Sequence, residues 1–174
     1  MKKRVYFDTS AVIKEFVVEK GSELVDKIAN AATDQKLQII SSVWSINESI
    51  AVIDRLSRQK FEETGNPKLS TQEKQEIIST FVQRVSESDE KSYFFFAPLA
   101  HEIVSKSRVL IDGYHISADD ALHVYTAYIF DCTFFLIHDH KTVNRIKKAL
   151  ENDMKVIDLG EESDREYVTS ELRL

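Results

Sequence analysis

The sequence has few of the residues that mark disulfide-rich, loop-rich or membrane-spanning proteins. Among its 174 residues are one cysteine, two prolines and four glycines. The lone Cys132 excludes an internal disulfide and a thiolate zinc site, and it suits a reducing compartment. The longest apolar segments, at 94–99 and 133–137, have the length of strands, whereas a bilayer-spanning helix needs about 20 apolar residues. We therefore expect no membrane insertion.

The first residues also lack the apolar core of a secretion signal. After the basic start, only Val5-Tyr6-Phe7 precede Asp8, which is too short for such a signal. These features together predict a cytoplasmic protein.

The charge balance is negative, at −6, with 43% hydrophobic and 30% charged residues. This size and composition predict a single domain over residues 1–174. A negative chain is a poor general binder of nucleic acid, because phosphate is bound mainly by Lys and Arg. A nuclease is still compatible, since bound cations reverse the sign of an acidic cluster. Four basic residues form either a local substrate face or a solvated helix face: Lys141, Arg145, Lys147 and Lys148.

Strand and helix patterns alternate along the chain. Strands are expected at 4–7, 37–40, 93–96, 133–137 and 156–159, and helices at 9–19, 22–32, 42–59, 70–88, 99–111, 117–130 and 142–150. Gly21 and Gly113 are expected to end helices. The alternation predicts an α/β fold whose central parallel sheet has right-handed crossovers.

Two segments stand apart from this alternation. Residues 54–92 contain a loop at 62–69 and then a capping-box pattern at Ser70 and Glu73, so we interpret this segment as a helical excursion from the sheet. The C-terminal tail, at about 160–174, begins with the acidic stretch 161–166. It either packs as a short helix or frays.

Four carboxylates, Asp8, Glu48, Asp120 and Asp139, are each expected at the end of a strand or early in the following helix. Because the carboxyl ends of parallel strands lie on one edge of the sheet, these acids can meet there. Few basic residues neighbour them in the sequence. A bound cation is therefore the natural source of compensating charge, and we place the active site at this edge.

The first two acids have different alternatives. Asp8 can serve as a helix N-cap, although Thr9 or Ser10 can also do so. Glu48 has Trp44 and Val52 as its i±4 neighbours, so no intrahelical salt bridge is available. A carboxylate in these apolar surroundings needs a tertiary cation, which is either a distant Lys or Arg or a metal ion. We favour the metal for both residues.

Asp120 has a strong structural alternative. The spacing from Ser117 to Asp120 is that of a capping box, and an acid in the first turn complements the helix dipole. Asp119 is the second choice for a ligand on the same helix start. His123 lies one turn later, where it either orients Asp120 through a hydrogen bond or packs in the core.

Asp139 follows the apolar run that ends at Ile137 and precedes a helix, so it repeats the expected geometry of Asp8. If the chain stays extended, His138 and His140 point away from Asp139. We therefore expect both histidines to be exposed turn residues. Oxygen-only ligands suit Mg²⁺ or Mn²⁺, and such ions best serve phosphodiester hydrolysis.

In these motifs the chain resembles the PIN-domain nucleases, in particular the toxin component of VapBC-type toxin–antitoxin pairs. The motifs run nearly from end to end: Tyr6-Phe7-Asp8-Thr9-Ser10-Ala11, Ser45-Ile46-Asn47-Glu48, Ala118-Asp119-Asp120-Ala121-Leu122-His123 and His138-Asp139. Two features differ from the family. Ile137 stands where the family often has Thr, and the excursion at 54–92 is longer than in the compact toxins.

The resemblance implies a three-layer α/β/α fold, Mg²⁺- or Mn²⁺-dependent cleavage of RNA, a homodimer and an antitoxin partner. It also implies that Asp8, Glu48, Asp120 and Asp139 are the metal-binding acids, with Thr9 or Ser10 as a supporting hydroxyl.

Two other functions remain open from the residues. A PIN scaffold can act as a non-catalytic RNA- or protein-binding module. An aspartyl-phosphate phosphatase also begins with an Asp after the first strand, but it needs a second Asp where Ser10 stands.

Overall fold

A parallel sheet forms the centre of the protein. The computed structural model describes residues 2–58, 69–150 and 153–174. In these residues the strands are β1 (Lys3–Phe7), β2 (Leu37–Ser42), β3 (Phe94–Ala97), β4 (Phe134–Ile137) and β5 (Lys155–Asp158). They are ordered β3-β2-β1-β4-β5, and every neighbouring pair is parallel. The predicted parallel α/β sheet is thereby confirmed.

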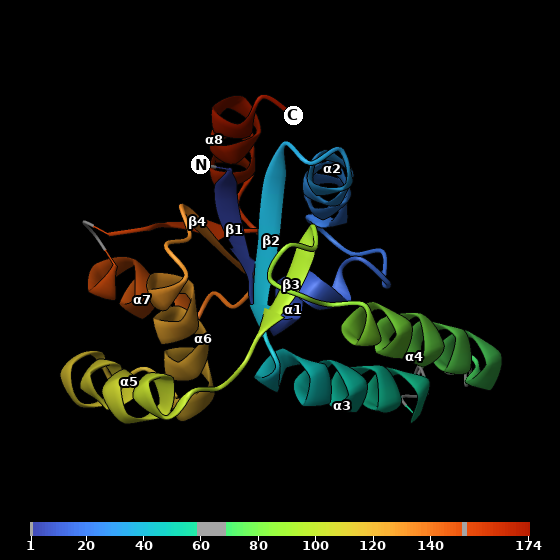
Figure 1. Ribbon diagram of the computed structural model, residues 1–174, viewed down its shortest axis with the longest axis horizontal. Coiled ribbons are helices and arrows are strands. Elements are labelled where there is room, and N and C mark those ends of the chain that lie inside the picture. Colours follow the sequence, from blue (N-terminus) through green and yellow to red (C-terminus); the bar gives the residue numbers. More distant parts are fainter. Residues whose placement is uncertain (1, 59–68, 151–152) are drawn as a thin grey trace.

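Helices cover both faces of this sheet (Figure 1). They are α1 (Thr9–Ile13), α2 (Ser22–Thr33), α3 (Trp44–Arg58), α4 (Thr71–Ser86), α5 (His101–Tyr114), α6 (Ala118–Ile129), α7 (Val143–Ala149) and α8 (Glu162–Leu172). One core cluster joins the sheet to α1, α2, α4 and α8, and a second joins it to α6 and α7. The result is the predicted three-layer α/β/α architecture.

The central strand β1 shows how the sequence specifies these layers. Val5 and Phe7 belong to the core cluster beside α2, whereas Tyr6 belongs to the cluster beside α6. Tyr6 stacks on Phe135 of β4 with ring centroids 5.2 Å apart. A strand buried on both faces needs a continuous apolar run, which explains why β1 and β4 lack polar alternation.

Two predicted helix ends are wrong. The first helix ends at Ile13 instead of near residue 19. The next residues form separate hydrogen-bonded turns, which place the Phe16 ring against Phe81 of α4. Gly21 does not end that helix; it is the N-cap of α2, with φ of 92°. Gly113 lies inside α5, which ends with His115 in the left-handed region.

The excursion is docked on the sheet through α4. Its capping box is confirmed, with Ser70 and Glu73 each bonding the other's backbone N–H. Phe81 is fully buried, and the Arg84 guanidinium forms an ion pair with the buried Glu15. These contacts join the excursion to the layer containing α2. Most of the predicted loop at 62–69 lies outside the described residues.

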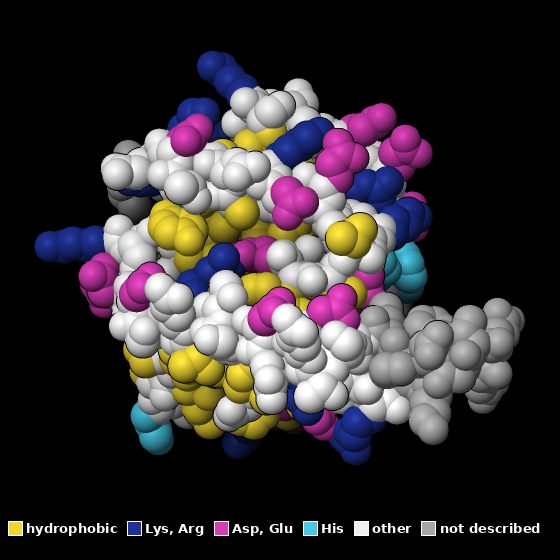
Figure 2. All heavy atoms as spheres, turned by 90° about the vertical axis from the view of Figure 1, so that its right-hand side faces the viewer, with side chains coloured by type: hydrophobic (Ala, Val, Ile, Leu, Met, Phe, Trp, Pro, Cys, Tyr) yellow, Lys and Arg dark blue, Asp and Glu magenta, His cyan; other side chains and the backbone are white. Residues whose placement is uncertain are grey.

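The C-terminal tail packs as a helix. Val168 of α8 is fully buried in the same core cluster as β1. Among the described residues, no helix has the length and apolar character needed to cross a bilayer. On the side of the molecule where α2, α3 and α4 lie, Lys and Arg are interspersed with Asp and Glu (Figure 2).

Candidate active site

Asp8 lies directly after β1 and is buried, with only 7% of its surface exposed. Its Oδ1 accepts hydrogen bonds from the Ala11 backbone N–H, at 3.0 Å, and from the Ser10 hydroxyl, at 2.6 Å. Ser10 also accepts a bond from the backbone N–H of His138, at 2.7 Å. The Ser10 hydroxyl thus connects Asp8 to the loop that follows β4.

Burial leaves Asp8 with a high affinity for a proton. Desolvation by burial, with a smaller effect of the Asp120 charge, raises the pKa of Asp8 to about 6, and it outweighs His123 and the bonds from Ser10 and Ala11, which lower the pKa. No Lys or Arg of the described residues forms an ion pair with this carboxylate. A divalent cation would supply the missing positive charge.

Glu48 has tertiary partners that the sequence did not reveal. Its Oε2 accepts hydrogen bonds from the Thr9 hydroxyl and from His123 Nε2, the latter at 2.8 Å. Burial raises the pKa of Glu48, but these bonds outweigh it, so the pKa lies below the ordinary value. The partners of Glu48 are therefore an imidazole and a hydroxyl; of the two alternatives for His123 the structure shows the buried one, with the hydrogen bond made to Glu48 instead of Asp120.

His123 is itself held by a buried tyrosine. The Tyr6 hydroxyl lies 2.8 Å from His123 Nδ1, and the imidazole is only 3% exposed. Because the Glu48 carboxylate only accepts, Nε2 must carry the proton. In the neutral imidazole, Nδ1 then accepts from Tyr6, which burial keeps protonated by raising its pKa well above the ordinary value. Tyr6 thus selects the tautomer that orients Glu48.

Asp120 is half-buried in the first turn of α6. Ser117 caps the helix by accepting from the Asp120 N–H, at 3.1 Å, and its hydroxyl donates to Asp120 Oδ2 at 2.6 Å. Burial raises the pKa of Asp120, and the charge of Asp139 adds to this effect. Ser117 therefore caps the helix and also holds the Asp120 carboxylate, on which the charge of Asp139 acts. Asp119 is exposed on the same turn.

Asp139 is exposed in the loop before α7. Its Oδ1 accepts from the Lys141 N–H at 2.9 Å, and its Oδ2 accepts from the Thr142 hydroxyl at 3.3 Å. The charge of Asp120 raises the pKa of Asp8, and that of Asp139 raises the pKa of Asp120, although among the described residues no three of the four acids have ligand atoms within 4.8 Å of one another. The four predicted acids thus occur at one edge of the sheet.

The oxygen donors of this edge fit Mg²⁺ or Mn²⁺, which prefer carboxylates. Two of the four acids, Asp8 and Asp120, have raised pKa values because burial disfavours their charges. A divalent ion would lower both. The four acids could therefore hold such an ion, with Ser10, Thr9 and Ser117 fixing the carboxylates.

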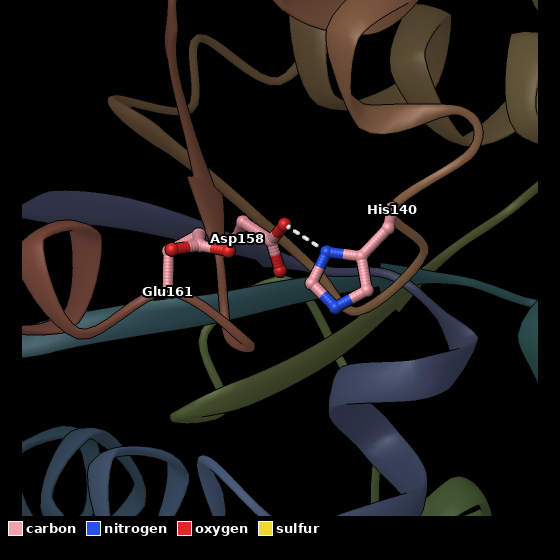
Figure 3. A group of neighbouring side chains, drawn as sticks. All are labelled: His140, Asp158 and Glu161. Carbon is pink, nitrogen blue, oxygen red and sulfur yellow. Dashed lines mark ion pairs between the residues drawn. The ribbon is translucent and has the colours of Figure 1, made fainter.

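A tighter group of metal-ligand side chains lies next to this edge, and the sequence reasoning missed it. Within the described residues, ligand atoms of His140, Asp158 and Glu161 all lie within 4.8 Å of one another. Figure 3 shows Asp158 between the other two side chains. His140 is an exposed turn residue as expected, but its Nδ1 also lies 2.9 Å from Asp158 Oδ2, and His138 is half-buried instead of exposed. The sequence signal that could have revealed this group is Asp158, an acid at the end of a strand.

Fold and site together define a three-layer α/β/α protein with a carboxylate cluster at the carboxyl edge of its sheet. No protein-family model matches the chain, and no curated protein matches its sequence. Among solved structures, the chain is similar to one from a toxin–antitoxin complex of Klebsiella pneumoniae, with a TM-score of 0.53 and 14% identity. The match covers 89% of this chain and 97% of that one. At this identity the similarity concerns the fold.

Proposed function

We propose that this protein is a metal-dependent endoribonuclease of the PIN type and the toxin of a toxin–antitoxin pair. The observation that carries the proposal is the buried Asp8 carboxylate, which has no Lys or Arg partner among the described residues and whose pKa is raised by burial and by the charge of Asp120. The fold of a chain from a toxin–antitoxin complex supports the toxin role.

In this proposal Asp8, Glu48, Asp120 and Asp139 hold Mg²⁺ or Mn²⁺. The ion supplies charge neutralisation at the phosphodiester and a more acidic water for attack on phosphorus. The protein contributes preorganised carboxylates. Each hydroxyl or imidazole hydrogen bond limits the rotation of its acid, so the ligands need little rearrangement when the ion and the substrate bind.

Basic residues in and before α7 are the proposed contacts with the RNA backbone. Lys141 and Lys148 are exposed, whereas Lys147 pairs with Asp164 and Arg145 donates to the His115 carbonyl. Lys141 lies close to Asp139 in the chain, whereas Lys148 lies with Met154 and Lys155 near the other end of α7. This small basic contribution suits local binding of a phosphate near the metal, in a protein whose net charge is −6.

The proposed partners are an antitoxin and a second copy of the chain. Exposed apolar side chains lie on α5 and α6, namely Val104, Val109, Tyr128 and Ile129, and they offer surface for a homodimer. Light scattering on the purified protein measures the oligomeric state. Inducible expression should arrest bacterial growth, and co-expression of the neighbouring small gene should relieve the arrest.

The direct test is cleavage of a mixed pool of RNA by the purified protein. We expect fragments in Mn²⁺ or Mg²⁺ and none in EDTA, and the double variant Asp8→Asn/Asp120→Asn should be inactive in both. Cleavage by the double variant at the wild-type rate would point to a contaminating nuclease. RNA binding without cleavage by the wild type, under every metal condition, would instead favour the non-catalytic module.

A further inference from the structure

A second metal site is suggested by His140, Asp158 and Glu161, which lie between β4, β5 and α8 (Figure 3). Asp158 ends β5 and is 2% exposed. Its Oδ1 accepts from the Gly160 N–H at 2.8 Å, and its Oδ2 faces His140 Nδ1. Within the described part of the chain, no Lys or Arg forms an ion pair with this buried carboxylate.

The backbone brings the other two groups to Asp158. The Glu161 N–H donates to the Asp158 carbonyl at 3.0 Å, which closes the turn into α8. Gly160 leaves room for the imidazole, since a Cβ there would lie 2.6 Å from His140 Cε1. His140 and Glu161 are both exposed, so solvent and ions can reach the group.

His138 lies beside His140. Its Nδ1 is buried and has no hydrogen-bond partner among the described residues. The His138 and His140 rings have centroids 5.6 Å apart. The nearby Lys14 is held in an ion pair with Glu19 at 3.2 Å. His138 does not belong to the group whose ligand atoms lie within 4.8 Å of one another, so it neighbours His140 without being one of the proposed ligands.

We propose that His140, Asp158 and Glu161 form a Zn²⁺ site, with the fourth coordination position open to water. Imidazole and carboxylate together suit zinc, whereas Mg²⁺ prefers oxygen alone. Tetrahedral ligands with bonds of about 2.1 Å lie about 3.4 Å apart. The His140 Nδ1 to Asp158 Oδ2 distance of 2.9 Å therefore widens when zinc replaces the hydrogen bond, which the exposed His140 permits.

Such a site would connect the loop carrying Asp139 to the turn between β5 and α8. Zinc bound there would restrict the loop between β4 and α7 without taking part in the reaction. The proposal is independent of the nuclease function, because none of its ligands belongs to the four-acid cluster.

The test uses the Asp8→Asn/Asp120→Asn protein, which weakens the four-acid site and leaves the second site intact. Calorimetric titration with ZnCl₂ should show one Zn²⁺ per chain. Adding His140→Ala should lower the affinity by at least tenfold, because a ligand is lost. His101→Ala is the matched control on an exposed histidine and should change nothing. An absence of Zn²⁺ uptake, or equal affinity with and without His140, would overturn the site.

Three further variants separate ligation from nonspecific attraction. Glu161→Gln should weaken Zn²⁺ binding, whereas Glu162→Gln, its exposed neighbour, should not. Gly160→Ala keeps every ligand but displaces the imidazole, and it should weaken binding as well. Equal effects of Glu161→Gln and Glu162→Gln would show that surface charge alone attracts the ion, which contradicts the proposal.

Stability provides a readout that needs no activity. Saturating Zn²⁺ should raise Tm of the double variant by roughly 5 °C, since an ion that binds only the folded state stabilises it. Co²⁺ in place of Zn²⁺ should give the visible absorption of a four-coordinate site. Both signals should disappear with His140→Ala, and their persistence there would exclude His140 as a ligand.

Discussion

His123 Nε2 lies 2.8 Å from Glu48 Oε2, which joins α6 to α3 across the candidate active site. The same oxygen accepts a bond from Thr9. Glu48 is thus an ionised carboxylate held from two sides, a suitable arrangement for a metal ligand. Glu48 also links two helices as a hydrogen-bond partner. A metal-binding role and a purely structural role lead to different expectations for its substitution.

For Glu48→Gln we expect a folded protein that loses most of its RNA cleavage. The amide oxygen still accepts from His123, so the free energy of unfolding in EDTA should fall by no more than about 1 kcal/mol. The lost charge, in contrast, weakens metal binding. Cleavage in Mn²⁺ and denaturant melts in EDTA measure the two effects. A large loss of metal-free stability with full activity would assign Glu48 a structural role only.

The two acids at the start of α6 form a matched pair. Asp120→Asn should abolish metal-dependent cleavage, because Asp120 is one of the proposed metal ligands, whereas the exposed Asp119→Asn should retain much of it. If Asp120 served only the helix start, its substitution would cost about 1 kcal/mol of stability and spare catalysis. An active Asp120→Asn protein would therefore argue against the whole site, and Mn²⁺ calorimetry should show the same contrast.

Asp8 should make the metal-free protein less stable as the pH rises. Its pKa of about 6 in the folded state exceeds the ordinary 3.8, so the folded protein binds the proton more tightly. Stability is then lost between about pH 4 and pH 6, by up to about 3 kcal/mol, and stays low above that range.

Asp8→Asn should remove this loss, because the neutral amide still accepts the bonds from Ser10 and Ala11. In EDTA the variant should be more stable than the wild type at neutral pH and equally stable near pH 4. Mn²⁺ should reverse the order by stabilising the wild type. Denaturant melts across this pH range measure the difference, and a variant that is less stable at every pH would contradict the prediction.

Gly21 and Gly113 should respond oppositely to alanine. Gly21 has φ of 92°, and a Cβ there would lie 2.8 Å from the Leu159 carbonyl oxygen. Gly21→Ala should therefore cost about 2 kcal/mol or more. Gly113 lies in α5 with nothing within 4 Å of a Cβ, so Gly113→Ala should stabilise by roughly 0.5–1 kcal/mol. Denaturant melts of both variants measure these changes in the free energy of unfolding. Similar effects at the two positions would contradict the prediction.

Local patterns in the sequence are enough to predict the alternation of strands and helices and the caps of several helices. Continuous apolar runs at β1 and β4 indicate strands buried on both faces, and Ser70 with Glu73 identifies the start of α4 without tertiary information. These signals are local, because hydrophobic period and cap chemistry act over a few residues. The strand-end positions of Asp8 and Asp139 follow from the same local pattern.

Tertiary structure alone decided which groups accompany those acids. Glu48 contacts His123, which lies 75 residues later in the chain, because α3 and α6 lie at the same edge of the sheet. The end of α1 at Ile13 depends on contacts of the next turn with Phe81 and Arg84 of α4. His140 meets Asp158 because β4 and β5 are neighbours. Such pairs depend on strand order and helix packing, which no local pattern specifies.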